Sequence, residues 1–168
     1  MSKIRIAVAG AGLIGRRHIE LIKASPSCEL AAVVDPLEID AQYLDSLGVT
    51  HYADLSACFA EDKPDGVILA TPNALHVEQT LQCIEAGVAA LIEKPVAHSV
   101  AEGKRLLAVA DATGARLLVG HHRAHSPILA KAREVIRDDI LGEIVAVQGS
   151  ALFYKPDDYF DAAIWRRQ

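Results

Sequence analysis

Three glycines near the N-terminus have the spacing of a loop that can bind phosphate. Gly10, Gly12 and Gly15 follow a short apolar run and precede a segment with helical spacing of its apolar residues. In such a unit the first glycine permits a tight turn, the second lets the backbone approach a pyrophosphate, and the third lets helix pack on strand. Free N–H groups in the first turn of that helix, which includes Leu13 and Ile14, would face the phosphate oxygens.

An acidic residue follows at the distance that such a loop requires. Asp35 lies 20 residues past Gly15, directly after a second apolar run. A carboxylate at this place accepts hydrogen bonds from the adenosine ribose hydroxyls and repels a 2′-phosphate. Neither Pro36 nor Leu37 is an arginine that would bind that phosphate. We therefore expect NAD as the cofactor and favour it over NADP; FAD, S-adenosylmethionine or a glycine turn without ligand are the alternatives.

Polar side chains also follow two later apolar runs, where a doubly wound sheet places its ligands. Thr71 and Asn73 could bond cofactor hydroxyls, or they could cap the helix that follows. Lys94 lies at the end of another apolar run, and lysine is costly to bury unless it has a function. We therefore expect Lys94 to be a functional residue.

The elements that must position these residues alternate along the chain. Apolar runs of the kind found in strands covered on both faces alternate with segments of helical spacing. The strands are expected at residues 4–9, 30–34, 65–70, 88–92 and 116–119, with a weaker candidate at 50–52. Gly48, Gly87 and Gly114 are placed to end helices. The pattern predicts an α/β fold with a doubly wound parallel sheet of the Rossmann type.

The C-terminal part departs from this alternation. A helix is expected at residues 127–138, ended by Gly142, and is followed by a long strand at 143–154. A strand of that length needs partners, because an unpaired edge promotes aggregation. We expect the chain to be the front part of a longer protein, in which this strand is paired.

Composition excludes several classes of protein. The 168 residues carry a net charge of −5 and contain no block of five like charges, so neither nucleic acid nor an anionic membrane is an expected partner. No apolar run approaches the roughly 18–20 residues of a membrane span. Three cysteines without a CxxC pair are typical of a reducing cytosol, so we expect a cytoplasmic protein. His121, His122 and His125 are interpreted as loop residues, and no metal site is expected.

Taken together, the motifs resemble one family of oxidoreductases. These motifs are AGAGLIG at 9–15, Asp35, ATPNALH at 70–76, EKP at 93–95 and a late Trp-Arg pair. The sequence is similar to the Gfo/Idh/MocA oxidoreductases over essentially all its length, and EKP is the most specific motif. The resemblance implies an N-terminal NAD(P)-binding domain, here residues 1–122, and a C-terminal α/β substrate domain with an open antiparallel sheet, of which 123–168 would be the start.

The resemblance also implies roles for individual residues. Lys94 would be the catalytic residue, placed near the nicotinamide and the substrate oxygen. Glu93 and Pro95 would shape its turn, and the family often has a cis bond before this proline. The remaining cofactor-site residues implied by the resemblance are Thr71, Pro72, Asn73, His76, Arg123, Trp165 and Arg166.

The implied reaction is hydride transfer between nicotinamide and a hydroxyl or carbonyl carbon of a sugar, inositol or related polyol. Family members carry an aspartate and a histidine for acid–base chemistry a little beyond the Trp-Arg pair, and the sequence stops at Gln168. We therefore expect the isolated chain to be inactive, and the full-length protein to form a homo-oligomer through the C-terminal sheet. The alternative is a dinucleotide-binding module without turnover.

Overall fold

The computed structural model describes residues 2–161 of the chain. These form two compact units, Met1–Ala124 and His125–Gln168, which are described separately. Among the described residues, no helix is long and apolar enough to cross a membrane.

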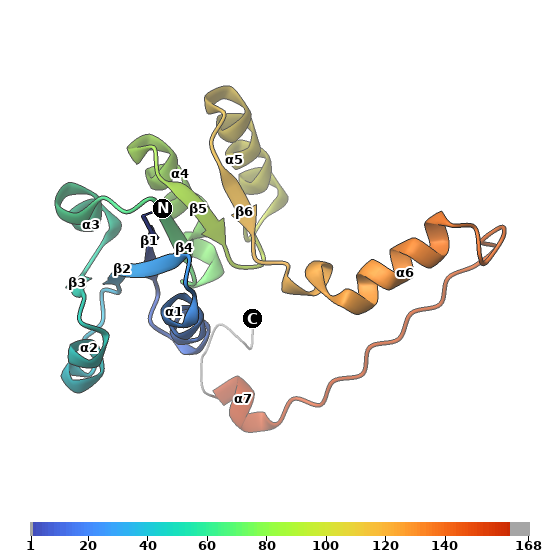
Figure 1. Cartoon of the computed structure of the whole chain (residues 1–168), viewed down its shortest axis with the longest axis horizontal. Coiled ribbons are helices and arrows are strands. Elements are labelled where there is room, and N and C mark those ends of the chain that lie inside the picture. Colours follow the sequence, from blue (N-terminus) through green and yellow to red (C-terminus); the bar gives the residue numbers. More distant parts are fainter. Residues whose placement is uncertain (1, 162–168) are drawn as a thin grey trace. The chain divides into compact units, whose positions relative to one another are not determined.

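The first unit is built on a six-stranded sheet in which all strand pairs are parallel (Figure 1). The strand order is β3-β2-β1-β4-β5-β6, so the order reverses between β1 and β4. This confirms the predicted doubly wound sheet, and the weak candidate at 50–52 is a real strand. The strands are β1 Ile4–Ala9, β2 Cys28–Val34, β3 Thr50–Tyr52, β4 Gly66–Leu69, β5 Ala89–Ile92 and β6 Leu117–Val119.

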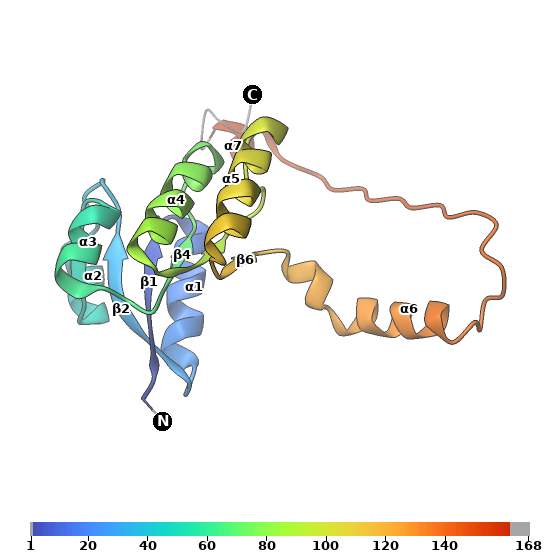
Figure 2. The same ribbon diagram turned by 90° about the horizontal axis from the view of Figure 1, so that it is seen from above.

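Helices connect the strands and flank the sheet (Figures 1 and 2). Gly48, Gly87 and Gly114 adopt the left-handed conformation just past three of these helices, as predicted. The helices of this unit are α1 Leu13–Ala24, α2 Ala41–Leu47, α3 Leu55–Asp62, α4 His76–Ala86 and α5 Val100–Thr113, and 3₁₀ turns lie at Asn73–Leu75 and His122–His125.

Helix α3 is absent from the sequence-based expectation. Its apolar residues are nearly consecutive and form no clear helical stripe. Asp54 nevertheless provides a helix-start signal, because its side chain accepts a hydrogen bond from the N–H of Ala57 at 2.9 Å.

Apolar side chains fill both faces of the sheet. On one face, Val8 of β1 packs in a cluster with Ile19 and Ile22 of α1. On the other face, Ala9 packs in a cluster with Val77 of α4 and Leu106 of α5. Because successive side chains of a strand point to opposite faces, a strand covered by helices on both sides must be apolar at consecutive positions.

The second unit contains helix α6 Pro127–Arg137 and helix α7 Asp157–Asp161. Ser126 caps α6 by accepting a hydrogen bond from the N–H of Ile128, and Pro127 lies at its first position. The helix ends at Arg137 and not one residue later, and Asp139 already has a positive φ of 56°. Gly142, the predicted stop, therefore lies in the turn beyond the helix end.

The predicted strand at 143–154 is wrong for this structure. Residues 144–156 have no regular secondary structure, and Val145 and Leu152 are 93% and 94% exposed. A strand is stabilised by hydrogen bonds to a neighbouring strand. No described segment of the chain pairs with these residues, so their β-branched and aromatic composition does not produce a strand here.

The buried cysteines allow a test of the core. Cys58 and Cys83 are free and fully buried, so both are small core residues. Burial raises the pKa of the Cys58 thiol to about 11 and that of Cys83 to about 12. The thiolate is the reactive form of cysteine, so both groups stay protonated and unreactive in the native protein at pH 8.

We predict that an aromatic disulfide reagent at pH 8 modifies the half-buried Cys28 first. Cys58 and Cys83 should react at least tenfold more slowly, and all three should react together after unfolding in guanidinium chloride. Mass spectrometry of partly labelled protein measures the order. Equal labelling of all three thiols in the native protein would contradict the packing described above.

Candidate cofactor-binding site

The predicted functional residues of the first unit gather where the parallel strands end. The registers pair the last residues of adjacent strands, so the residues that follow them share one edge of the sheet. Gly10 follows β1, Asp35 follows β2, Ala70 and Thr71 follow β4, and Glu93 follows β5. Ligands of doubly wound sheets bind at this edge, beside the strands where the order reverses.

The three loop glycines have three different steric surroundings. At Gly10, where φ is +89°, an added Cβ would lie 2.7 Å from the carbonyl oxygen of Ala70. At Gly15 it would lie 1.7 Å from the carbonyl oxygen of Gly10. At Gly12 it would meet nothing within 4 Å. The first and third glycines are therefore required by the protein itself, whereas Gly12 leaves open space in front of the backbone.

The N-terminus of α1 faces this open space without a capping side chain. Gly12 is the N-cap residue, and the first helical turn contains no acidic residue. The first hydrogen bond of the helix joins the N–H of Arg16 to the carbonyl of Gly12 at 2.9 Å, so the N–H groups before it have no intrahelical acceptor. Leu13 and Ile14 are 80% and 50% exposed. This arrangement suits an anion such as a pyrophosphate.

Asp35 is attached to the same loop. Its Oδ2 accepts a hydrogen bond from the N–H of Ala11 at 2.7 Å, and its Oδ1 accepts one from the N–H of Leu37 at 3.0 Å. Each carboxylate oxygen can accept a further bond. The carboxylate is thus held beside the glycine loop with acceptor capacity left for ribose hydroxyls, and these residues fit a dinucleotide.

Thr71 and Asn73 do not cap the following helix. The residues that precede the 3₁₀ turn and α4 are Pro72 and Leu75, and neither turn nor helix has a side-chain cap. The Thr71 hydroxyl instead donates to the Gln79 side-chain oxygen at 2.5 Å. The capping alternative is therefore wrong, while contact of Thr71, Pro72 and Asn73 with a cofactor stays a prediction.

The buried side chain of His76 lies between the turn that contains Thr71 and the turn that contains Pro95. It is 1% exposed, and its Nδ1 and Nε2 lie 2.8 Å and 2.9 Å from the carbonyl oxygens of Pro95 and Thr71. Carbonyl oxygens only accept, so both contacts are hydrogen bonds when the ring is protonated at both nitrogens, and a neutral ring forms one of them. Both nitrogens are directed at the protein backbone, and contact of His76 with a cofactor stays a prediction.

Lys94 is exposed, so its place at the end of β5 carries no burial cost, and the functional role expected from that cost stays a prediction. Its N–H donates to Oε2 of Glu93 at 3.2 Å, and the Lys94–Pro95 bond is cis, as the resemblance implied. Because its side chain is not packed into the core, the Lys94 ammonium is accessible from solvent at the sheet edge.

One partner of this turn was missed by the sequence analysis. His18, on α1, places its Nε2 2.9 Å from Oε1 of Glu93. Gly120 adjoins the same carboxylate, since an added Cβ would lie 3.0 Å from Oε1. His18 lies one helical turn past Gly15, which the sequence does show, but no local pattern indicates that its partner is 75 residues away.

The other predicted site residues are less informative. Arg123 is exposed in the 3₁₀ turn His122–His125. Trp165 and Arg166 lie outside the described residues, so their predicted roles stay predictions. Within residues 2–161, no group of three or more His, Cys, Asp or Glu side chains is arranged to hold a metal ion.

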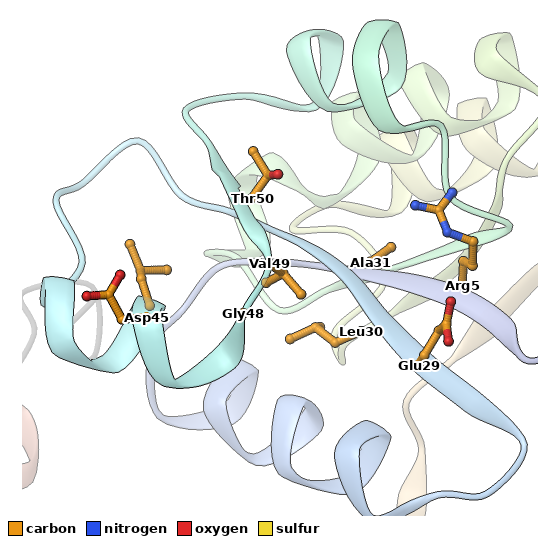
Figure 3. A pocket seen from close by; sticks show the side chains of 9 residues that line it. Arg5, Glu29, Leu30, Ala31, Asp45, Gly48, Val49 and Thr50 are labelled. Carbon is orange, nitrogen blue, oxygen red and sulfur yellow. The ribbon is translucent and has the colours of Figure 1, made fainter.

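A depression of about 500 Å³ lies elsewhere, beside β2 and the end of α2 (Figure 3). Arg5 and Glu29, near the starts of β1 and β2, belong to its lining, as does Thr50 at the start of β3. Arg5 is already paired with Asp62. Because this depression adjoins the amino ends of the strands, it is separate from the edge that carries Gly10 and Asp35.

Comparison with known proteins agrees with this geometry. The family model for Gfo/Idh/MocA, an oxidoreductase family with an NAD-binding Rossmann fold, matches residues 4–121. The chain belongs to this family. Its matched residues include the glycine loop, Asp35 and the Glu93–Pro95 turn.

Relatives in the family extend beyond the length of this chain. The 4-carboxy-2-hydroxymuconate-6-semialdehyde dehydrogenase of a Sphingobium strain is 33% identical over 147 residues, which are 86% of this chain and 45% of that protein. The scyllo-inositol 2-dehydrogenase (NAD(+)) of Bacillus subtilis is 31% identical, over 91% of this chain and 44% of that protein. The chain spans less than half the length of these relatives.

A solved structure is also similar to nearly all of this chain, which corresponds to about half of the solved chain. The WlbA dehydrogenase of Bordetella pertussis, crystallised with NADH and UDP-GlcNAcA, matches with a TM-score of 0.90 at 30% identity. The match covers 97% of this chain and 48% of that chain.

The different surroundings of the glycines lead to a paired prediction. Gly12→Ala should leave the melting temperature nearly unchanged but weaken NADH binding at least tenfold, because the methyl group would occupy the open space in front of the loop. Gly15→Ala should destabilise the fold by more than the ~1–3 kcal/mol typical of overpacking, because its Cβ would overlap a backbone oxygen.

Circular dichroism melts and nicotinamide fluorescence titrations measure the two effects. Gly48→Ala is a poor control because of its positive φ, whereas Gly149→Ala is a suitable one, since its Cβ would meet nothing within 4 Å. Equal destabilisation by Gly12→Ala and Gly15→Ala would contradict the described loop geometry.

Proposed function

We propose that this chain binds NAD and provides the cofactor-binding half of a dehydrogenase that acts on CH–OH groups. The observation that supports this most is the glycine loop. Three features lie together at one edge of the sheet: the open space at Gly12, the uncapped N-terminus of α1 and the Asp35 carboxylate. Membership of the oxidoreductase family supports the same proposal.

In this proposal each end of the dinucleotide has its own residues. The N–H groups of the first α1 turn bind the pyrophosphate, and Asp35 accepts hydrogen bonds from the adenosine ribose hydroxyls. Its negative charge disfavours the 2′-phosphate of NADP. The rest of the cofactor site is formed by Thr71, Pro72, Asn73, Arg123, Trp165 and Arg166.

Lys94 is the proposed catalytic residue at the nicotinamide end. Bound NAD would supply hydride transfer to or from a substrate carbon. The Lys94 ammonium would donate a hydrogen bond to the substrate oxygen, orient it, and stabilise the negative charge that develops there. Its exposure at the sheet edge leaves the group accessible to a substrate.

A sugar, inositol or related polyol is the proposed substrate class. The support comes from relatives, among them the scyllo-inositol 2-dehydrogenase of Bacillus subtilis and the D-glucoside 3-dehydrogenase of Escherichia coli. We also propose that residues 123–168 begin a substrate domain and that its sheet mediates homo-oligomer formation in a cytoplasmic enzyme. The exposed apolar residues of 144–154 are consistent with a strand that forms only beside such partners.

Titration with NADH and NADPH tests the cofactor proposal. Wild-type chain should bind NADH at least tenfold more tightly than NADPH, because Asp35 repels the 2′-phosphate. Asp35→Ala should weaken NADH binding about tenfold, through the loss of charge-assisted hydrogen bonds, and should remove most of the preference. Nicotinamide fluorescence measures both affinities.

Asp35→Asn removes the negative charge but keeps the size of the side chain, and the asparagine oxygen can still accept the hydrogen bond from the N–H of Ala11. It should improve NADPH binding relative to NADH while keeping the melting temperature. If the wild-type protein melts cooperatively, and so is folded, but binds neither NADH nor NADPH, the proposed function is refuted. Unchanged discrimination in Asp35→Ala would refute the role of this carboxylate.

A further inference from the structure

The turn Glu93–Pro95, called the Lys94 turn below, is anchored to helix α1 by the side chains of Glu93 and His18. Glu93 follows β5, and its carboxylate is largely shielded, with 16% of the side chain exposed. Oε1 lies 2.9 Å from Nε2 of His18, and Oε2 accepts the N–H of Lys94 at 3.2 Å. The two oxygens of one carboxylate thus connect α1 with the backbone of Lys94.

The surroundings leave this carboxylate little freedom. Oε1, Cδ and Oε2 of Glu93 would lie only 3.0–3.3 Å from a Cβ at Gly120, so the absence of a side chain after β6 makes room for the Glu93 carboxylate. The His18 side chain is 20% exposed. A shielded hydrogen bond to a carboxylate is stronger than one on the surface, because water competes less for it.

His18 also has a defined relation to the loop that would bind the pyrophosphate. It lies three residues past Gly15, on the same helix. Gly15 in turn packs directly against the backbone of Gly10. The contact from His18 to Glu93 therefore joins the element at the pyrophosphate end of the site to the turn at the end of β5.

We propose that His18 is a positioning residue, which acts through Glu93 to hold Lys94 at a fixed place relative to the α1 N-terminus. The inference rests on the proposed function, because it assigns the nicotinamide half of the dinucleotide to the Lys94 turn. Loss of His18 leaves the glycine loop and Asp35 intact but releases that turn on the Glu93 side. Binding of the nicotinamide half then weakens, while binding of the rest of the dinucleotide does not.

NADH and ADP-ribose distinguish the two halves, because ADP-ribose has the pyrophosphate and both riboses but no nicotinamide. For His18→Leu we expect NADH affinity to fall about tenfold, as for loss of a hydrogen bond to a charged group, with ADP-ribose affinity within about twofold of wild type. His18→Gln should recover most of the NADH affinity, because its amide can donate to Glu93 from a similar position. Glu20→Gln, on the exposed face of the same helix, is the matched control.

Two more variants test the connection itself. Glu93→Ala combined with His18→Leu should weaken NADH binding no more than Glu93→Ala alone, because loss of the carboxylate already removes the link to His18. Gly120→Ala should displace the Glu93 carboxylate from the other side and give the same selective loss of NADH affinity. This variant keeps the proposal testable if His18→Leu melts at a much lower temperature.

The outcomes separate this inference from the proposed function. Equal losses of NADH and ADP-ribose affinity in His18→Leu would show that His18 only stabilises α1, and wild-type affinity for both would show that it has no role. Wild-type protein that binds neither nucleotide would refute the proposed function. In that case the amide proton shift of Lys94, recorded by NMR without ligand, still tests the anchor, and an identical shift in His18→Leu would overturn it.

Discussion

The close backbone approach of Gly15 to Gly10 is the constraint on which the candidate site depends. Helix α1 can begin against the end of β1 only because Gly15 has no Cβ. A Cβ at Gly15 would lie 1.7 Å from the carbonyl oxygen of Gly10. This approach directs the α1 N-terminus along the sheet edge where β2 and β4 also end. The N–H groups of its first turn, the Ala11 N–H and the Asp35 carboxylate come together there.

The two ends of the site are built from different interactions. The glycine-loop end consists of backbone groups whose positions follow from glycine sterics and from one hydrogen-bonded carboxylate. The Lys94 end is held by side chains that reach across the fold. Glu93 Oε1 lies 2.9 Å from Nε2 of His18 on one side, and the Pro95 carbonyl oxygen lies 2.8 Å from Nδ1 of His76 on the other. Hydrogen bonds to shielded partners hold such a turn more firmly than the turn residues do alone.

Sequence patterns succeeded where a local property decides the structure. Consecutive apolar residues identified the strands of a sheet covered on both faces, and left-handed glycines marked three helix ends. They failed for the segment 143–154, which has strand composition but no strand, because pairing requires a partner elsewhere. They also missed helix α3, whose apolar residues are nearly consecutive and show no helical spacing.

The sequence alone determined the parallel α/β fold, the glycine loop with Asp35, and the family, because each depends on residue types at fixed spacings along the chain. Only the tertiary structure decided that Thr71 bonds Gln79 and caps no helix, that His76 is buried between two turns, and that His18 meets Glu93. The physical reason is the same in all three cases. A side chain's hydrogen-bond partner is set by which elements the fold brings together, and an unpaired polar group in the interior costs more free energy than local sequence preference can offset.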